Sequence, residues 1–198
     1  MTGTLTKLGL LALLGLPAAW AGPLLTLTPN PGSTFNNGFG YSVGYEFTTS
    51  SSITVDELAF FADPTLSQSH AVGIYTTGGS LLVSTTVTTA DPVSNFFAYH
   101  TITPYLLGAG TYVIVGVTGT VDPYSSTPTT FSIAPGVTFV MSEYIVSSTL
   151  AFPNSTDSNT GYFGPNLDIA AVPEPGAMLM LGAGLLALGA SRLRRRRS

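Results

Sequence analysis

The sequence predicts an all-β fold, an antiparallel β-sandwich or jelly-roll-like body, with an N-terminal signal peptide and a short C-terminal transmembrane helix. Over residues 22–171, short runs rich in Val, Ile, Thr, Tyr and Phe are separated by clusters of Gly, Pro, Asn, Asp and Ser. No helical pattern of useful length interrupts them. Each end of the chain instead carries an apolar run beside basic residues. These observations divide the chain into residues 1–21, 22–171 and 172–198.

Residues 1–21 have the three parts of a secretory signal peptide. Lys7 precedes an apolar run of about nine residues, and small residues follow at Ala19 and Ala21. This run is shorter than the roughly 20 apolar residues that a membrane-spanning helix needs. We therefore expect signal peptidase to cut before Gly22 and the body to be exported.

The body is predicted to contain eight strands at regular spacing, with Gly- and Pro-containing turns, which is typical of a two-layer antiparallel sandwich. In the first of these strands, alternate residues such as Tyr45 and Phe47 share one face. The alternation shifts at Asp56-Glu57 in the second, which indicates a bulge or bend. The predicted strands are Tyr41–Thr48, Ile53–Ala62, His70–Tyr75, Leu81–Thr88, Phe96–Thr103, Thr111–Thr118, Thr129–Ile133 and Val137–Val146.

Residues 172–198 form a tail in three parts. Pro173, Glu174 and Pro175 come first, and the two prolines end any preceding strand or helix. The apolar residues 176–191 follow, close to the lower limit of about 17 residues for a helical span. The last seven residues are rich in arginine, which marks the cytoplasmic side of a membrane segment and acts as a stop-transfer signal. These arginines are Arg192, Arg194, Arg195, Arg196 and Arg197.

This tail resembles the PEP-CTERM sorting signal of bacterial exported proteins. The resemblance implies recognition by an exosortase, a membrane-embedded cysteine peptidase that cuts near the motif. Pro173, Glu174 and Pro175 would then be substrate residues of another enzyme. The body would face away from the cytoplasm until processing sends it toward the cell surface or the exopolysaccharide matrix of a biofilm.

Parts of the body resemble β-sandwich domains often found ahead of PEP-CTERM tails. The likeness implies a fold and no particular reaction. The segments that carry it are Gly44–Phe47, Ile53–Leu58, His70–Tyr75, Gly79–Leu82 and Leu107–Val113.

Charge excludes several function classes. Only 8% of the residues are charged, against about 25% in ordinary soluble domains. All six basic residues lie at the two ends, so residues 22–172 hold nine carboxylates and no Lys or Arg. Such a body cannot neutralise phosphates, which argues against nucleic-acid binding. The absence of cysteine excludes disulfides, thiolate catalysis and cysteine-ligated zinc.

Hydroxyl residues are abundant: Ser and Thr supply 43 of the 151 residues from 22 to 172. Hydroxyls on outer strand faces keep a chain with few charges soluble, and Thr favours strands. A second interpretation is O-glycosylation of the tracts Thr48–Ser52 and Ser125–Thr130. Asn154 heads an N-x-S/T sequon and is a possible N-glycosylation site in a host that has the transferase.

We expect the body not to be an enzyme. His70 and His100 are its two imidazoles, and no Gly-x-Ser-x-Gly turn or similar context accompanies them. No catalytic residue, cofactor or metal ligand is therefore predicted. Calcium remains open, because the cations could neutralise the unpaired acids, although no Asp-x-Asp-x-Asp loop is present. The available carboxylates are Asp56, Glu57, Asp63, Asp91, Asp122, Asp157 and Asp168.

The leading hypothesis is a structural or adhesive protein of the cell surface or extracellular matrix. The alternative is a calcium- or carbohydrate-binding module on the same export route, and a hydrolase comes last. Sandwich modules often bind sugars through exposed aromatic rings, although most such rings belong to the core. The candidates are Tyr99, Tyr105, Tyr124, Tyr144, Tyr162 and Phe163.

Overall fold

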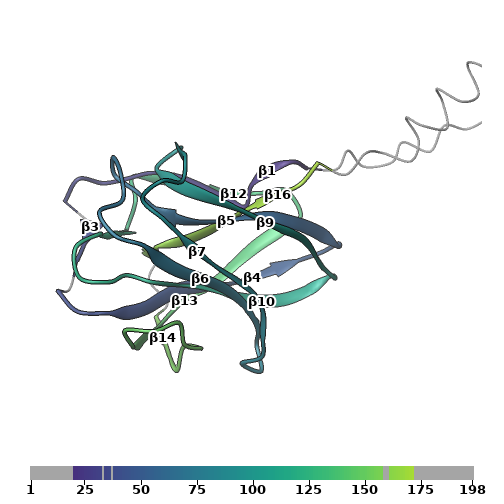
Figure 1. Ribbon diagram of the computed structural model, residues 1–198. Coiled ribbons are helices and arrows are strands. Elements are labelled where there is room, and N and C mark those ends of the chain that lie inside the picture. Colours follow the sequence, from purple (N-terminus) through teal and green to yellow (C-terminus); the bar gives the residue numbers. More distant parts are fainter. Residues whose placement is uncertain (1–19, 33, 37, 158–160, 172–198) are drawn as a thin grey trace, which may run out of the picture. The chain divides into compact units, whose positions relative to one another are not determined.

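The computed structural model describes residues 20–32, 34–36, 38–157 and 161–171 (Figure 1). The predicted signal peptide up to Ala19 and the tail from Val172, with its apolar helix and arginines, lie outside the described residues. Within the described ranges, no helix is long and apolar enough to cross a membrane.

The described residues form two larger and two smaller antiparallel sheets. The larger sheets have the orders β14-β13-β4-β10-β6-β7 and β1-β16-β5-β9-β8, and the smaller ones are β15-β11-β3 and β12-β2. The first sheet contains β4 (Tyr41–Thr49), β6 (His70–Thr76), β7 (Leu81–Val87), β10 (Gly110–Val117), β13 (Val137–Val146) and β14 (Ser155–Asp157). The second contains β1 (Gly22–Pro23), β5 (Ile53–Phe61), β8 (Val93–Ser94), β9 (Phe97–Leu107) and β16 (Pro165–Ile169). The smaller sheets contain β2 (Leu25–Thr28), β3 (Thr34–Phe35), β11 (Tyr124–Ser126), β12 (Thr130–Ile133) and β15 (Gly161–Phe163).

The two larger sheets are layers that bury one hydrophobic core between them (Figure 1). Tyr45 and Phe47 of β4 are fully buried there, as the alternation predicted, and so is Phe60 of β5. The layers come so close that a Cβ added to Gly116 of β10 would lie 2.9 Å from the ring of Phe60. The prediction of an all-β body built from antiparallel sheets is confirmed.

Irregular features of the second sheet follow from particular residues. The β5–β9 register shifts between Val55 and Glu57, which confirms the bulge predicted there. The predicted strand Phe96–Thr103 in fact continues to Leu107, through Pro104. Proline is tolerated because β8 covers only the first two residues of β9, so Pro104 lies on a strand edge beside the bulge and need not donate a hydrogen bond.

Both ends of the body are hydrogen-bonded to strands of the second sheet. The described residues between Trp20 and Ala171 form one compact unit. Near its start, Leu24 N–H donates to the Leu167 carbonyl, and near its end Ala170 N–H donates to the Thr54 carbonyl, both at 2.8 Å. Because these hydrogen bonds tie both ends of the body into the second sheet, we expect residues 22–172 to fold on their own.

Candidate functional site

His70, the first of the two histidines, is a buried cross-link between segments that are distant in the sequence. Its Nε2 lies 2.9 Å from Asp122 Oδ2, and its Nδ1 lies 2.7 Å from the Val117 carbonyl oxygen. The ring stacks on Phe60 at 3.9 Å. Since both nitrogens face acceptors, the imidazole has no free nitrogen left to act as a base.

His100 is held in a similar way at the surface. Its Nδ1 lies 3.0 Å from both carboxylate oxygens of Asp91, which also accepts the backbone N–H of Thr88 at 2.6 Å. The bonds to Thr88 and His100 lower the pKa of Asp91 although burial raises it. Both imidazoles of the body are therefore paired with aspartates in loops, a pairing that the sequence analysis did not find.

The carboxylates considered for calcium do not assemble into a metal centre in the described ranges. No group of three or more His, Asp or Glu residues lies close enough there to hold an ion. Where acids do meet, they repel one another. Burial, then the charges of Asp56 and Glu57, raise the pKa of Asp168 to about 6.

Three of the six aromatic candidates for sugar binding meet at one place. The rings of Tyr124 and Tyr162 are 5.6 Å apart, and those of Tyr144 and Tyr162 are 5.4 Å apart. The other three are elsewhere: Phe163 and Tyr99 are buried in the core, and Tyr105 packs against it.

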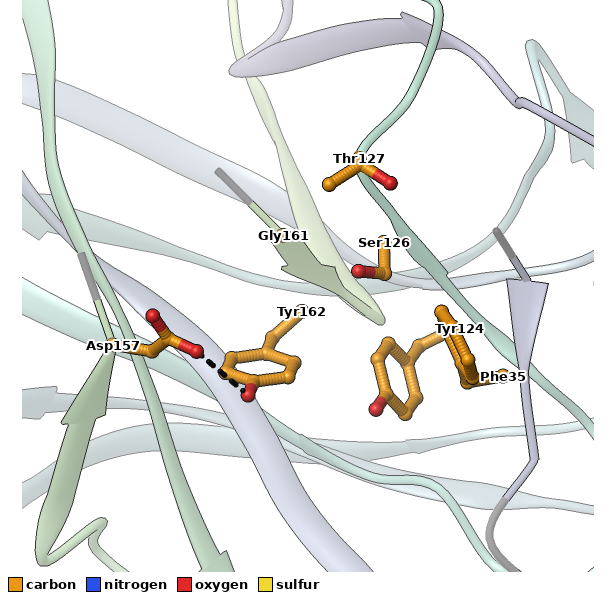
Figure 2. A pocket seen from close by; sticks show the side chains of 7 residues that line it. All are labelled: Phe35, Tyr124, Ser126, Thr127, Asp157, Gly161 and Tyr162. Carbon is orange, nitrogen blue, oxygen red and sulfur yellow. Dashed lines mark hydrogen bonds between the residues drawn. The ribbon is translucent and has the colours of Figure 1, made fainter. Parts of the chain in front are cut away.

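Two adjoining hollows surround these rings, and we call them the tyrosine hollows. The larger has a volume of about 270 Å³ and the smaller about 170 Å³, and Tyr124 and Tyr162 line both. Figure 2 shows the larger hollow, lined by Phe35, Tyr124, Ser126, Thr127, Asp157, Gly161 and Tyr162. The smaller is lined by Tyr41, Val43, Tyr124, Tyr144 and Tyr162.

The backbone around the larger hollow is unusual. Tyr162 has φ 75° and Thr127 has φ 45°, both in the left-handed region that bulky and β-branched residues rarely adopt. The β11–β15 register also shifts between Ser125 and Ser126. Strained residues of this kind persist where the surrounding structure fixes them, and they cluster at binding sites. Here they place the Tyr162 ring beside Tyr124 (Figure 2).

One carboxylate, that of Asp157, lines the larger hollow. The Tyr162 hydroxyl donates to Asp157 Oδ2 at 3.1 Å. Burial, followed by the hydrogen bond and charge of Asp157, raises the pKa of Tyr162 to about 12. Residues 22–172 contain no Lys or Arg.

Sequence reasoning missed Phe35 and Asp157 as partners of these tyrosines. Phe35 belongs to a two-residue strand, too short for a periodic signal, and its ring lies 6.2 Å from that of Tyr124. Asp157 appeared only among the possible calcium ligands. Its meeting with Tyr162 is specified by three-dimensional pairing, because β14 and β15 belong to different sheets.

Two predicted modification sites fall partly within the described residues. Gly22, expected to follow the signal cleavage, starts β1 opposite Ile169 of β16, and Ala21 before it is exposed. Asn154 is exposed just before β14. The sorting residues Pro173, Glu174 and Pro175 lie outside the described ranges.

Comparison with known families gives two matches. Residues 26–164 match the family model described as a domain of unknown function, DUF4082. Residues 171–197 match the PEP-CTERM protein-sorting motif, which confirms the resemblance of the tail. No curated protein and no solved structure matches the chain. The DUF4082 match contains every residue that lines the tyrosine hollows.

Proposed function

Because the chain belongs to the DUF4082 family and ends in a PEP-CTERM motif, we propose that it is a non-catalytic, adhesive protein of the cell surface or exopolysaccharide matrix. The motif makes the chain an exosortase substrate that is exported and sorted to the cell surface. In this proposal the body binds polysaccharide at the tyrosine hollows.

The meeting of Tyr124, Tyr144 and Tyr162 carries the proposal. Aromatic rings offer flat apolar surface for the faces of sugar rings, while polar groups at the rim bond sugar hydroxyls. Ser126, Thr127 and Asp157 supply such groups in the larger hollow. Of the rings around it, Phe35 is 46% exposed and therefore accessible to a glycan.

The pairing of the histidines supports a non-catalytic role. A histidine that acts as a general base needs a free nitrogen within reach of a substrate. Both ring nitrogens of His70 are hydrogen-bonded inside the fold, to the Val117 carbonyl and to Asp122. The Nδ1 of His100 is hydrogen-bonded to Asp91, and neither residue lines the tyrosine hollows. Among the described residues that line the tyrosine hollows there is no histidine, and Asp157 is the one carboxylate.

Changing Phe35 to alanine should weaken glycan binding about two- to twelvefold, because an aromatic contact contributes about 0.5–1.5 kcal/mol. The measurement is a glycan array with residues 22–172, followed by isothermal titration of the ligands found. Phe96→Ala is the matched control, since it removes another exposed phenylalanine that lines neither hollow. Equal affinity of Phe35→Ala and the wild type would remove the tyrosine hollows from the proposal.

Deleting Pro173–Ser198 should release the body into the medium whether or not an exosortase is present, because the deletion removes the recognised motif and the apolar segment. Fractionation of cells and medium, with and without the exosortase gene, measures this. The full chain, in contrast, should depend on the exosortase for release. Unchanged localisation after the deletion would contradict the sorting role of the tail.

A further inference from the structure

The body around the tyrosine hollows is acidic and has few cations. Residues 22–172 contain nine carboxylates, no Lys and no Arg. The two histidines are paired with Asp122 and Asp91. A ligand that approaches the body therefore meets a negative field, which attracts cations and repels anions over about a Debye length.

The residues that line the larger hollow also favour a cation over an anion. Asp157 places a carboxylate against the hydroxyl of Tyr162, and the rings of Tyr124, Tyr162 and Phe35 lie around the same space (Figure 2). Faces of aromatic rings attract cations, and an adjacent carboxylate adds to the attraction. Three aromatic rings and one carboxylate thus form a hollow suited to an ammonium group and unsuited to a uronic acid.

We propose that the tyrosine hollows bind an ammonium-bearing glycan, the free amino sugars of a deacetylated polysaccharide. This inference rests on the proposed function and names its ligand class. The amino group would lie in the larger hollow, against Asp157 and the tyrosine rings. N-acetylation would abolish the preference, because the resulting amide carries no charge.

The position of the two hollows favours a chain over a small free cation. They share Tyr124 and Tyr162, so their occupants would be immediate neighbours. Consecutive sugar units of one polysaccharide are neighbours of this kind, whereas a small organic cation fills only one hollow. A tetrasaccharide should therefore bind more tightly than its monomer.

The test is isothermal titration of residues 22–172 with tetrasaccharides of matched length. The probes are a glucosamine tetramer, its fully N-acetylated form, a neutral glucan and a uronic acid tetramer, with glucosamine monomer and tetramethylammonium as small cations. The glucosamine tetramer should bind at least tenfold more tightly than the acetylated form. Its affinity should fall with added salt, and the uronic acid tetramer should show no binding.

Asp157→Asn should reduce the preference for the amino form over the acetylated form to less than threefold. Asp157→Glu keeps the negative charge and should retain most of the preference for the amino form. That result would show that the preference depends on the charge at this position. Glu57→Gln changes the net charge equally but lines neither tyrosine hollow, so its preference should match the wild type.

The possible outcomes separate this inference from the function on which it rests. Equal or tighter binding of the acetylated or uronic acid tetramer overturns the ammonium preference and leaves glycan binding intact. Equal binding of monomer and tetramer overturns the polysaccharide as the ligand. If none of the four tetramers nor any arrayed glycan binds, the proposed function fails with it.

Discussion

Replacing Asp122 with alanine is expected to lower the free energy of unfolding by about 3–5 kcal/mol, because it leaves the His70 imidazole and two backbone N–H groups without their acceptor, at about 1–3 kcal/mol for each buried group. His70 is 1% exposed, and its Nε2 faces Asp122 Oδ2 at 2.9 Å. The same carboxylate accepts the backbone N–H groups of Ser67 and Gln68, each at 2.9 Å. The substitution therefore loosens the loop between β5 and β6 as well as the imidazole.

The effect should depend on pH in a defined direction. Burial raises the pKa of Asp122, but the bonds from His70, Ser67 and Gln68 lower it more, so the net shift is downward. A carboxyl whose pKa is lower in the folded state stabilises the fold above its unfolded pKa, and this contribution is lost as the pH falls through the folded value. The wild type and Asp122→Ala should thus differ most near neutrality and converge in acid.

Urea unfolding between pH 3 and pH 7 measures this difference. Asp91→Ala is the matched control, because it breaks the other histidine–aspartate pair, in which the His100 side chain is 37% exposed. Exposed pairs contribute about 0–1 kcal/mol, so the control should cost far less. Similar losses for both variants would show that burial does not set the strength of the His70–Asp122 pair.

The parts of this fold that the sequence predicted are those with a local signal. In β4, apolar residues recur at every second position, so the buried face of Tyr45 and Phe47 follows from the strand period alone. The bulge in β5 could be predicted because Asp56-Glu57 interrupts that period. The tail was recognisable because its motif, apolar run and arginines stand in a fixed order.

The candidate site had no such signal. Tyr41, Val43 and Tyr144 come from the long strands β4 and β13, but the residues of the larger hollow come from or next to β3, β11, β14 and β15, strands of two or three residues. Phe35 pairs across 89 positions with Tyr124. Strands this short carry no period from which a face could be read. The left-handed backbone of Tyr162 is also unpredictable, because sequence preference reserves that region for glycine and asparagine. Only the long-range pairing of these strands creates the tyrosine hollows.

Two acids, Glu46 and Glu143, lie near this region on the outer face of the six-stranded sheet. Glu143 of β13 is opposite Gly44 of β4, and Glu46 is two residues farther along β4. On its other side, β13 pairs with β14, which ends at Asp157. Glu143 is only 7% exposed. Burial, then the charge of Glu46 and a hydrogen bond with Glu46, raise the pKa of Glu143 to about 7.

This pair should make the body less stable as the pH rises from about 4.5 to about 7. In that range the folded state keeps a proton on Glu143 that the unfolded chain has lost, so each increase in pH favours unfolding. The total loss is about 3 kcal/mol, at about 1.4 kcal/mol for each of the roughly 2.5 units between the unfolded and folded pKa values. Asp168, whose pKa is raised to about 6, should add to the slope in the lower part of the range.

Changing Glu143 to glutamine should remove most of this loss and make the variant about 2 kcal/mol more stable than the wild type at pH 8. The amide stays neutral throughout and can still donate to Glu46, as the protonated acid does. Urea unfolding at pH 4, 5, 6, 7 and 8 gives the two profiles, which should nearly meet at pH 4, separate between about pH 4.5 and about pH 7, and run parallel above that. Asp63→Asn, at an exposed carboxylate, is the control and should keep the wild-type slope. Parallel profiles for the wild type and Glu143→Gln from pH 4 to pH 8 would mean that the two acids do not share a proton.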